Sequence, residues 1–197
     1  MSEADTEAQL EAWYGAQTYR QPQVWDNPRF NHPAQPVVGV SVFEAQAYCR
    51  WLSAQQPGQQ YRLPTEAEWE AAARGSAGRR WPWAQPLGPE RWQINADPAH
   101  LRRTTPVGVF PAGDTPEGLV DLSGNVWEWT TSRYTARLDR EALTTAAADG
   151  SARRAVRGGS WNNPSALCRP GFRDRVAPDV RSGVLGFRVV CCPIQEP

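Results

Sequence analysis

The stretch RGGSWNNPSALCRPGFRDRVAPDVRSGVLGFRVV, residues 157–190, constrains the fold more strongly than any other part of this sequence. It opens on Gly158-Gly159 and closes on Gly186-Phe187, and glycine at such points lets backbones approach closely. The residues between these ends change in size and polarity without the repeat of a helix or a strand, and Pro and Arg interrupt them. The pattern predicts a stiff frame around a long irregular loop, a common location of binding or catalytic residues.

Upstream of this stretch, two capping boxes predict two helices. Ser41–Glu44 begins a helix that runs to about Ser53, and Thr65–Glu68 begins a second helix that ends near Gly75. In each box the first and last side chains satisfy the free N–H groups of the first helical turn. Glutamates in the second helix, with Arg62 before it, predict ion pairs that fix this helix in place.

The rest of the chain predicts short strands, turns and loops. Residues 3–14 are an exception, because Leu10 and Trp13 are spaced to share one helical face. Short strands are expected at residues 37–40 and 107–110. Trp127 and Trp129 alternate around Glu128, which predicts a strand with one buried aromatic face. Two helices with short strands and much loop define an α+β protein.

Composition limits the possible functions. The hydrophobic content of 40% with ten Trp favours a packed core, and the net charge of zero without a basic run argues against nucleic acid as a partner. Apolar runs fall short of the roughly 20 residues of a membrane span, and the acidic start is unlike a secretory signal. A cytoplasmic, reducing location is therefore expected. A zinc site is not favoured, because the chain has only two His and its cysteines lack CxxC spacing; they are Cys49, Cys168, Cys191 and Cys192.

Four segments in order resemble the formylglycine-generating enzyme family, also called the sulfatase-modifying-factor domain. They are PVVGVS with its helix to Trp51, RLPTEAEWE, the segment from Gly118 to GNVWEW, and RGGSW with GFR. Together they cover about residues 20–192. The resemblance implies a C-type-lectin-like fold, in which two helices surround a small twisted antiparallel sheet with long loops.

The resemblance also implies where catalysis would occur. Oxidases of the family bind copper(I) through two Cys in the loop after Gly-Gly-Ser, and two soft thiolates suit that ion. The matching positions here are Asn163 and Cys168, so one thiolate is missing. Another branch of the family uses non-haem iron with a His-rich triad, whereas His32 and His100 are the only histidines here. We therefore expect no copper and no enzymatic activity.

Calcium is a further implication of the resemblance. Family enzymes take calcium ligands from the Gly-Asn-Val-Trp-Glu-Trp turn and from an earlier Asn, which match Asn125, Glu128 and Asn95. Asp97 is the nearest candidate for a second acid of the earlier site. Oxygen ligands of this kind suit Ca²⁺. The alternative is that Asn125 is a turn residue and that Glu128 pairs with an Arg.

Residues 161–185 are also similar to the variable proteins of diversity-generating retroelements. In those systems adenines in a template copy are replaced at random, so AAC codons diversify and can never encode Lys, Glu, Gln, Met or Trp. None of these five residue types occurs between Asn162 and Val184, although they make up 36 of the 197 residues. Chance would leave such a window empty about once in a hundred draws. The alternative is an ordinary irregular loop.

This resemblance separates displayed positions from a fixed frame. The frame would comprise Trp161, Cys168, Arg169, Arg173, Arg175, Pro178, Asp179, Arg181 and Leu185. The displayed, ligand-binding positions would be Asn162, Asn163, Ser165, Ala166, Leu167, Phe172, Asp174, Val176, Ala177, Val180, Ser182, Gly183 and Val184. Among them Phe172 and Val176 are expected to make apolar contacts with the ligand, and Asp174 a polar one.

The sequence thus predicts one C-type-lectin-like domain over residues 1–197 that binds a protein ligand through a diversified region at about 161–185. The competing hypothesis is a catalytic or enzyme-associated member of the formylglycine-generating enzyme family. A third is an accessory recognition domain of a larger signalling protein.

Overall fold

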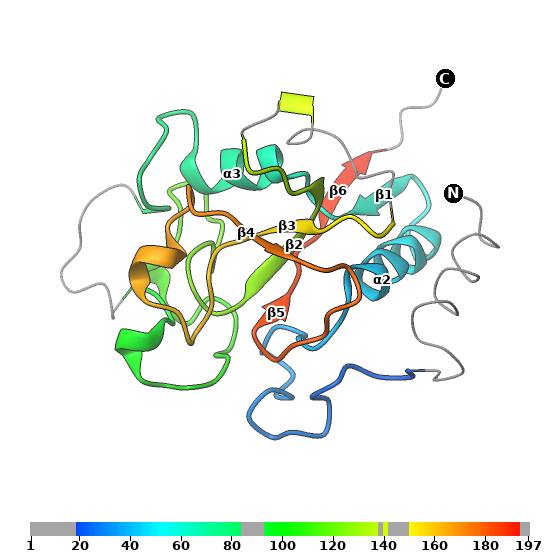
Figure 1. The fold of residues 1–197 in the computed structure, drawn as a ribbon, viewed down its shortest axis with the longest axis horizontal. Coiled ribbons are helices and arrows are strands. Elements are labelled where there is room, and N and C mark those ends of the chain that lie inside the picture. The colour runs from blue at the N-terminus through cyan, green and yellow to red at the C-terminus, as the bar shows by residue number, and fades with distance from the viewer. Residues whose placement is uncertain (1–18, 84–92, 138–139, 142–149, 194–197) are drawn as a thin grey trace.

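The computed structural model describes residues 19–83, 93–137, 140–141 and 150–193 (Figure 1). The helices are α2 (Val42–Gln55) and α3 (Glu66–Arg74), with the 3-10 turns η2 (Asp97–Ala99), η3 (Pro111–Gly113) and η4 (Ser165–Cys168). The strands are β1 (Gln59–Arg62), β2 (Trp127–Arg133), β3 (Arg154–Arg157), β4 (Asp174–Val176), β5 (Leu185–Gly186) and β6 (Val190–Pro193). The helix expected at residues 3–14 lies outside the described residues.

Both predicted helices are present and begin where their capping boxes place them. Ser41 caps α2, with its hydroxyl accepting from the backbone N–H of Glu44 while the Glu44 carboxylate accepts from the N–H of Ser41. Thr65 and Glu68 form the same reciprocal pair at the start of α3. α3 ends at Gly75, whose φ of 58° lies in the left-handed region that favours glycine.

The sheets are small and position the two ends of the candidate segment. Four strands pair in the order β4-β3-β2-β5, and β1 pairs with β6 in a separate antiparallel ribbon. The pairs β2–β3 and β3–β4 are antiparallel, whereas β2–β5 is parallel. The chain therefore leaves β3, forms β4 along one edge of the sheet, and returns to β5 on the opposite edge.

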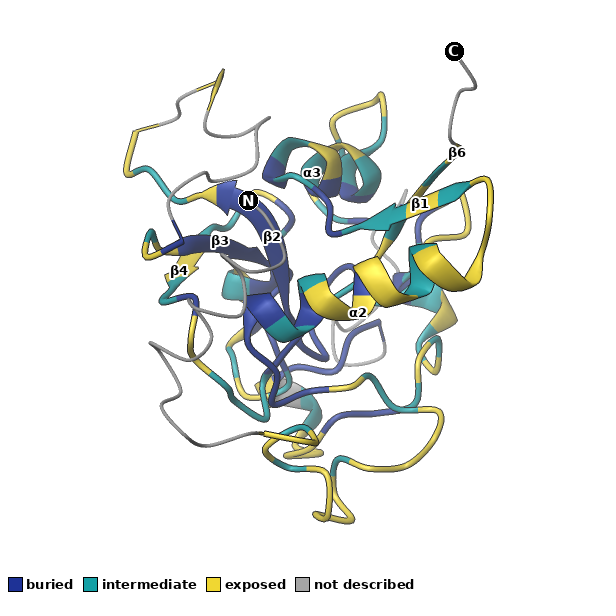
Figure 2. Cartoon of the chain, turned by 90° about the vertical axis from the view of Figure 1, so that its right-hand side faces the viewer, coloured by how far each residue is buried: buried dark blue, intermediate teal, exposed yellow. Residues whose placement is uncertain are grey.

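Strand β2 is the centre of the core. Trp127 and Trp129 are 7% and 0% exposed and pack with Phe43 and Cys49 of α2 and with Leu185 of β5. The predicted aromatic face of this strand is therefore confirmed. Figure 2 shows β2 and β3 in the buried colour while much of α2 faces solvent. In the described part of the chain, no helix is both long and apolar enough to cross a membrane.

Two predicted strands are absent from the structure. Residues 107–110 form a turn, and residues 37–40 contain a bend at Gly39 and are assigned to no strand. Gly39 explains the second difference, because its φ of 77° bends the chain. The N–H of Gly39 donates to the carbonyls of Ser182 (2.9 Å) and Leu185 (3.2 Å). This segment thus supports the far end of the 161–185 region instead of joining a sheet.

Candidate functional site in residues 161–185

Two left-handed glycines start the candidate segment. Gly158 and Gly159 have φ values of 95° and 72°. A Cβ on Gly159 would lie 2.6 Å from the Sγ of Cys168, so only glycine fits against the following 3-10 turn. At the other end, a Cβ on Gly186 would lie 2.7 Å from the carbonyl oxygen of Val37. The close approaches predicted at both ends of the frame are confirmed.

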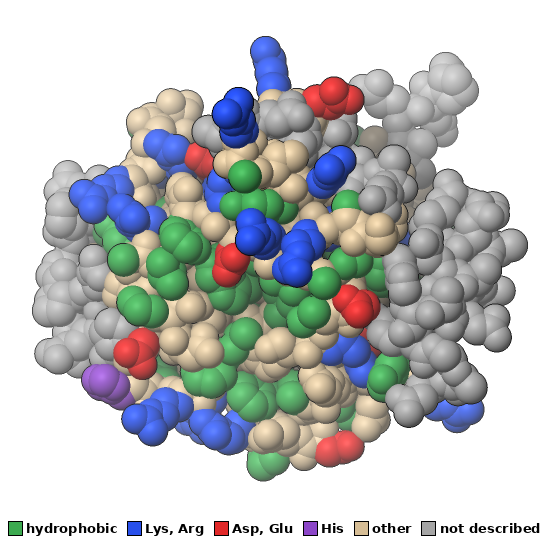
Figure 3. Space-filling view, viewed as in Figure 1, with side chains coloured by type: hydrophobic (Ala, Val, Ile, Leu, Met, Phe, Trp, Pro, Cys, Tyr) green, Lys and Arg blue, Asp and Glu red, His purple; other side chains and the backbone are tan. Residues whose placement is uncertain are grey.

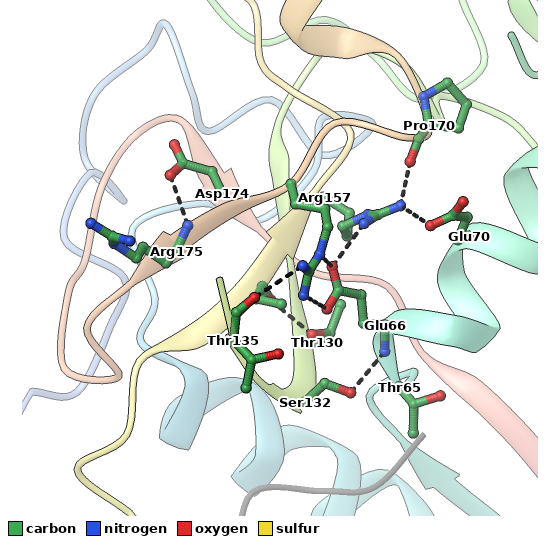
Figure 4. A network of polar contacts seen from close by, with 12 residues as sticks. Thr65, Glu66, Glu70, Thr130, Ser132, Thr135, Arg157, Pro170, Asp174 and Arg175 are labelled. Carbon is green, nitrogen blue, oxygen red and sulfur yellow. Dashed lines mark hydrogen bonds and ion pairs between the residues drawn. The ribbon is translucent and has the colours of Figure 1, made fainter. Parts of the chain in front are cut away.

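A buried ion network anchors the middle of the segment to α3 (Figure 4). Glu66 accepts from Arg157 Nη1 at 2.7 Å and from Arg173 Nε and Nη2 at 2.6 and 2.8 Å. Arg157 also donates to Glu70 at 2.7 Å and to the carbonyl of Pro170. The side chains of Arg157 and Glu66 are both fully buried. The hydrogen bond with Glu66 raises the pKa of Arg173 above its ordinary value.

A second ion pair anchors the end of the segment to α2. Arg181 donates to both carboxylate oxygens of Glu44, at 3.0 and 2.9 Å, and to the carbonyl of Gln21. Its guanidinium also lies 4.2 Å from the centre of the Tyr19 ring. Arg173 and Arg181, two arginines expected in the fixed frame, therefore tie the loop to both helices.

Sequence reasoning expected Glu–Arg pairs to fix α3 but missed the long-range partners. Arg62 pairs with Glu68 on the surface, whereas Glu66 pairs with arginines from the candidate segment. No local pattern marks Glu66 as the buried one, because its partners lie about 100 residues away in sequence. Tyr134 was also missed, although its ring lies 5.0 and 5.5 Å from the guanidiniums of Arg173 and Arg175.

The structure brings most of the predicted displayed positions to the surface. Those classed as exposed are Asn162, Ala166, Asp174 and Val180. Those at intermediate exposure are Asn163, Leu167, Phe172, Val176, Ala177, Ser182, Gly183 and Val184. Figure 3 shows apolar side chains interleaved with Arg over the middle of this face, where β3 and β4 lie in Figure 1.

Three displayed positions depart from the expectation of free side chains. Ser165 is only 8% exposed because it starts η4 under the Gly159 turn. Phe172 and Val176 pack against the main core, and the Phe172 ring lies 6.0 Å from that of Trp127. Part of their apolar area is therefore already used within the fold. Val180, at 37% exposed, is the one large apolar side chain among the displayed positions that is classed as exposed.

The thirteen positions do not line a pocket of about 660 Å³ that lies between α2 and the start of the described chain. Its lining includes Tyr19, Val37, Tyr48 and Phe187, together with Glu44. The candidate segment is thus an exposed surface and not the wall of an enclosed pocket.

The positions matched to the copper(I) pair do not form a thiolate site. Asn163 Oδ1 accepts from the backbone N–H and the hydroxyl of Ser160, at 3.1 and 2.6 Å. Cys168 is fully buried and packs with Trp83 and Ile94. Copper(I) prefers two soft thiolates, and an amide oxygen that already accepts two hydrogen bonds is a poor substitute. The donor set therefore does not fit the copper site of family oxidases.

The three residues predicted to bind calcium do not converge on one site. Asn95 and Asn125 contact each other at 3.3 Å, and Asn125 Oδ1 also accepts from the N–H of Thr105. The Glu128 carboxylate instead pairs with Arg188 at 2.6 Å and accepts from Trp69 Nε1 at 2.6 Å. Asn125 has a φ of 62°, as in a turn. This geometry supports the alternative of a turn residue and an Arg pair, and it does not fit a shared calcium site.

No other metal cluster replaces it. Over the described ranges, no group of three or more His, Cys, Asp or Glu side chains could hold a metal ion.

Sequence comparison places this fold in a family. Residues 5–192 match the sulfatase-modifying factor enzyme 1-like domain, so the chain belongs to that family. It is 38% identical to the formylglycine-generating enzyme of Streptomyces coelicolor over 86% of this chain and 57% of that enzyme. It is 36% identical to the hercynine oxygenase of Mycolicibacterium smegmatis over 85% of this chain and 42% of that enzyme. The chain thus spans roughly half the length of these relatives.

Structural comparison confirms the predicted fold class. Treponema denticola variable protein 1 superposes with a TM-score of 0.71 and 24% identity, over 94% of this chain and 80% of that chain. At this identity the likeness concerns the fold alone. The α+β, C-type-lectin-like architecture is therefore shared with a variable protein, whereas the sequence relatives are named as enzymes.

One expectation is overturned by these relatives. The missing second thiol predicted a chain that is not an enzyme, but both sequence relatives are named as enzymes and each match covers at least 85% of the chain. The prediction was wrong because it rested on the missing copper and iron ligands alone, whereas similarity over most of the chain relates it to proteins named as enzymes.

Proposed function

We propose that residues 161–185 form the surface through which this chain binds a protein ligand, and that the displayed positions on it are diversified. The observation that carries this proposal is the division of the segment into two kinds of position. Twelve of the thirteen displayed positions have some exposed area, and only Ser165 is buried. Arg173 and Arg181 of the frame reach back to buried or half-buried carboxylates.

Such a division lets the surface change while the fold stays intact. Side chains that contribute little to the core can be replaced at small cost in stability, typically within about 0.5 kcal/mol. The ion pairs that tie the segment to both helices come from the frame positions Arg173 and Arg181, so they survive those replacements. β4 is an edge strand with Asp174 and Arg175 exposed. Charged residues on an edge discourage uncontrolled strand pairing with other chains.

A protein is the favoured ligand because the surface is broad and mixed. Stable protein interfaces bury about 800 Å² on each partner, with aromatic and Arg residues as frequent anchors. The half-buried Phe172 and the exposed Val180 supply apolar contacts, and the exposed Asp174 and Arg175 supply polar ones.

Sequencing the DNA around the gene tests diversification directly. We expect a nearby reverse-transcriptase gene and a near-copy of the codons for residues 157–190. The two copies should differ only where the near-copy has adenine, and the differences should fall on the thirteen displayed positions. Absence of a near-copy, or differences spread over Arg173 and Arg181, would refute the diversified part of the proposal.

A display library tests binding. Varying the displayed positions other than Ser165, Phe172, Val176 and Val184, which are buried or pack against the core, should give well-folded variants. With AAC-derived codon choices, these variants should include some that bind an arbitrary target protein after selection. A matched library at frame positions Cys168, Arg173, Arg181 and Leu185 should give mostly unfolded variants and no binders. If the first library yields folded proteins without binders, the surface is not a ligand-binding one.

Catalysis is the second candidate function, favoured by the names of the sequence relatives and by Cys168 at a copper-thiolate position of the family. The test is aldehyde formation in a sulfatase-derived peptide with copper(I) supplied, compared between the wild type and Cys168→Ser. Aldehyde that depends on Cys168 would support an oxidase. Its absence from both proteins would count against this candidate.

A further inference from the structure

A recess with basic walls lies between the end of α3 and the chain that follows η4. Its volume is about 310 Å³. Among the described residues it is lined by Arg74, Gly78, Arg79, Arg80, Arg169, Gly171 and Phe172. Four of these seven residues are arginines, although the chain as a whole carries no net charge.

Two of the four arginines are neutralised by carboxylates and two are not. Arg74 pairs with Glu70 and Arg79 with Glu117, each at 2.7 Å. Arg80 and Arg169 have no acidic partner within the described residues. The recess therefore keeps an excess of positive charge beside walls that partly exclude water, where a charge interaction is stronger than in open solvent.

Neighbouring groups hold the recess in shape before any ligand arrives. Arg74 donates from Nε to the carbonyl of Arg79 and from Nη2 to that of Gly78, both at 3.1 Å, which fixes the turn after α3. Arg169 donates from Nε to the carbonyl of Ala166 at 3.0 Å. This bond orients the Arg169 guanidinium and leaves both Nη groups for another acceptor. Less conformational entropy is then lost on binding.

The recess also has an apolar wall. Phe172 lines it at intermediate exposure, and its ring is kept in place by Trp127, 6.0 Å away. A guanidinium fork matches the two oxygens of a carboxylate or the oxygens of a phosphate, and an aromatic face favours an apolar neighbour.

We propose that this recess binds an oxyanion, a carboxylate or a phosphate, carried on an apolar body, with Arg80 and Arg169 as the direct donors. The site goes beyond the proposed surface, because Arg80 lies outside residues 161–185 and neither arginine is a displayed position. The two arginines would fix the anionic end of a ligand, whereas the apolar wall depends on the displayed position Phe172. Binding should weaken with added salt, since screening reduces the attraction between exposed charges.

The test follows the Arg Nε–H signals by NMR while a probe is added. The probes are N-acetylphenylalanine, acetate and inorganic phosphate. We expect a saturable shift of the Arg80 and Arg169 signals with N-acetylphenylalanine, and binding at least tenfold weaker in R80Q/R169Q. A matched double variant of exposed arginines elsewhere, R50Q/R153Q, should bind as the wild type does.

Each outcome bears on the inference. Shifts that never saturate and are equal at Arg50 would mean general charge screening and would overturn it. Acetate binding as tightly as N-acetylphenylalanine would overturn the role of the apolar wall. If phosphate is the only probe that binds saturably, the oxyanion site is supported and its ligand is a phosphate. A thermal unfolding scan of R80Q/R169Q shows whether the double variant is folded. If it is not, the same titration is carried out with the single variants R80Q and R169Q.

A negative titration would not count against the proposed protein-binding surface. The display library is selected through displayed positions, whereas this titration reads Arg80 and Arg169, which are not among them. A negative titration with a positive library would overturn the recess alone.

Discussion

Replacing Glu66 by Gln should be one of the most damaging single isosteric changes on α3. The carboxylate of Glu66 is fully buried and accepts from both Arg157 and Arg173. The amide of Gln has nearly the same shape but no charge. E66Q would therefore leave the buried Arg157 and the 12% exposed Arg173 short of a counter-charge.

The magnitude follows from burial. Removing one member of a buried ion pair costs about 3–5 kcal/mol, because the partner stays buried without compensation. Arg157 keeps Glu70 and the carbonyl of Pro170. We therefore expect the lower part of that range, about 3–4 kcal/mol. For a chain of this size such a loss lowers the melting temperature by about 6–15 °C.

The assay is urea unfolding followed by Trp fluorescence, with E68Q as the matched control two residues along the same helix. The Arg62–Glu68 pair is 35% and 42% exposed, so its loss should cost about 0–1 kcal/mol. Gln can also replace Glu in the capping box. If E66Q is no less stable than E68Q, the buried network does not anchor the segment, and the argument for a fixed frame fails.

The other predictions concern the frame, pH and thiols. Gly159→Ala should destabilise by about 2–3 kcal/mol in urea unfolding, because the added Cβ meets Cys168 at a φ of 72°; Gly171→Ala, with nothing within 4 Å, is the control and should cost under about 1 kcal/mol. The hydrogen bond from Arg62 lowers the pKa of Glu68 to about 2. The stabilisation by the ionised Glu68 is therefore present above its unfolded pKa of about 4.3 and is lost as the pH falls toward 2. Wild type and E68Q should converge in free energy of unfolding over that pH range. A difference in stability that persists at pH 2 would contradict this. Ellman's reagent should label the exposed Cys191 rapidly and the buried Cys168 only on unfolding, with C191S losing the fast phase; a fast phase that survives in C191S would show that another thiol is accessible.

Local sequence predicted the helices because their signals are local. Ser41 with Glu44 and Thr65 with Glu68 satisfy the first turn of each helix from within four residues, whatever surrounds them. The paired Gly at positions 158 and 159 likewise indicated a close approach that only glycine permits. The strand expected at residues 37–40 failed because Gly39 bends the chain and its hydrogen bonds go to a loop over 140 residues away.

The candidate site was only partly predictable. The boundaries of the segment and the division between frame and display came from the sequence pattern. The sequence did not show which displayed side chains are available to a ligand. Phe172 packs against the core and Ser165 is buried, and neither residue type indicates this by itself. The sequence also did not show that Glu128 pairs with Arg188 and accepts from Trp69, because neither partner is near it in sequence. The calcium prediction itself stays a prediction.

By itself, the sequence determined the family, the two capped helices and the position of an irregular segment between two glycine-marked ends. These features depend on residues within a few positions of one another or on motifs in a fixed order. Only the tertiary structure decided that Glu66, and not Glu68, is the buried anchor, and that Arg80 and Arg169 share one recess. Charge pairing and solvent exclusion depend on distance in space, and the fold brings together residues that lie more than 140 positions apart in the chain.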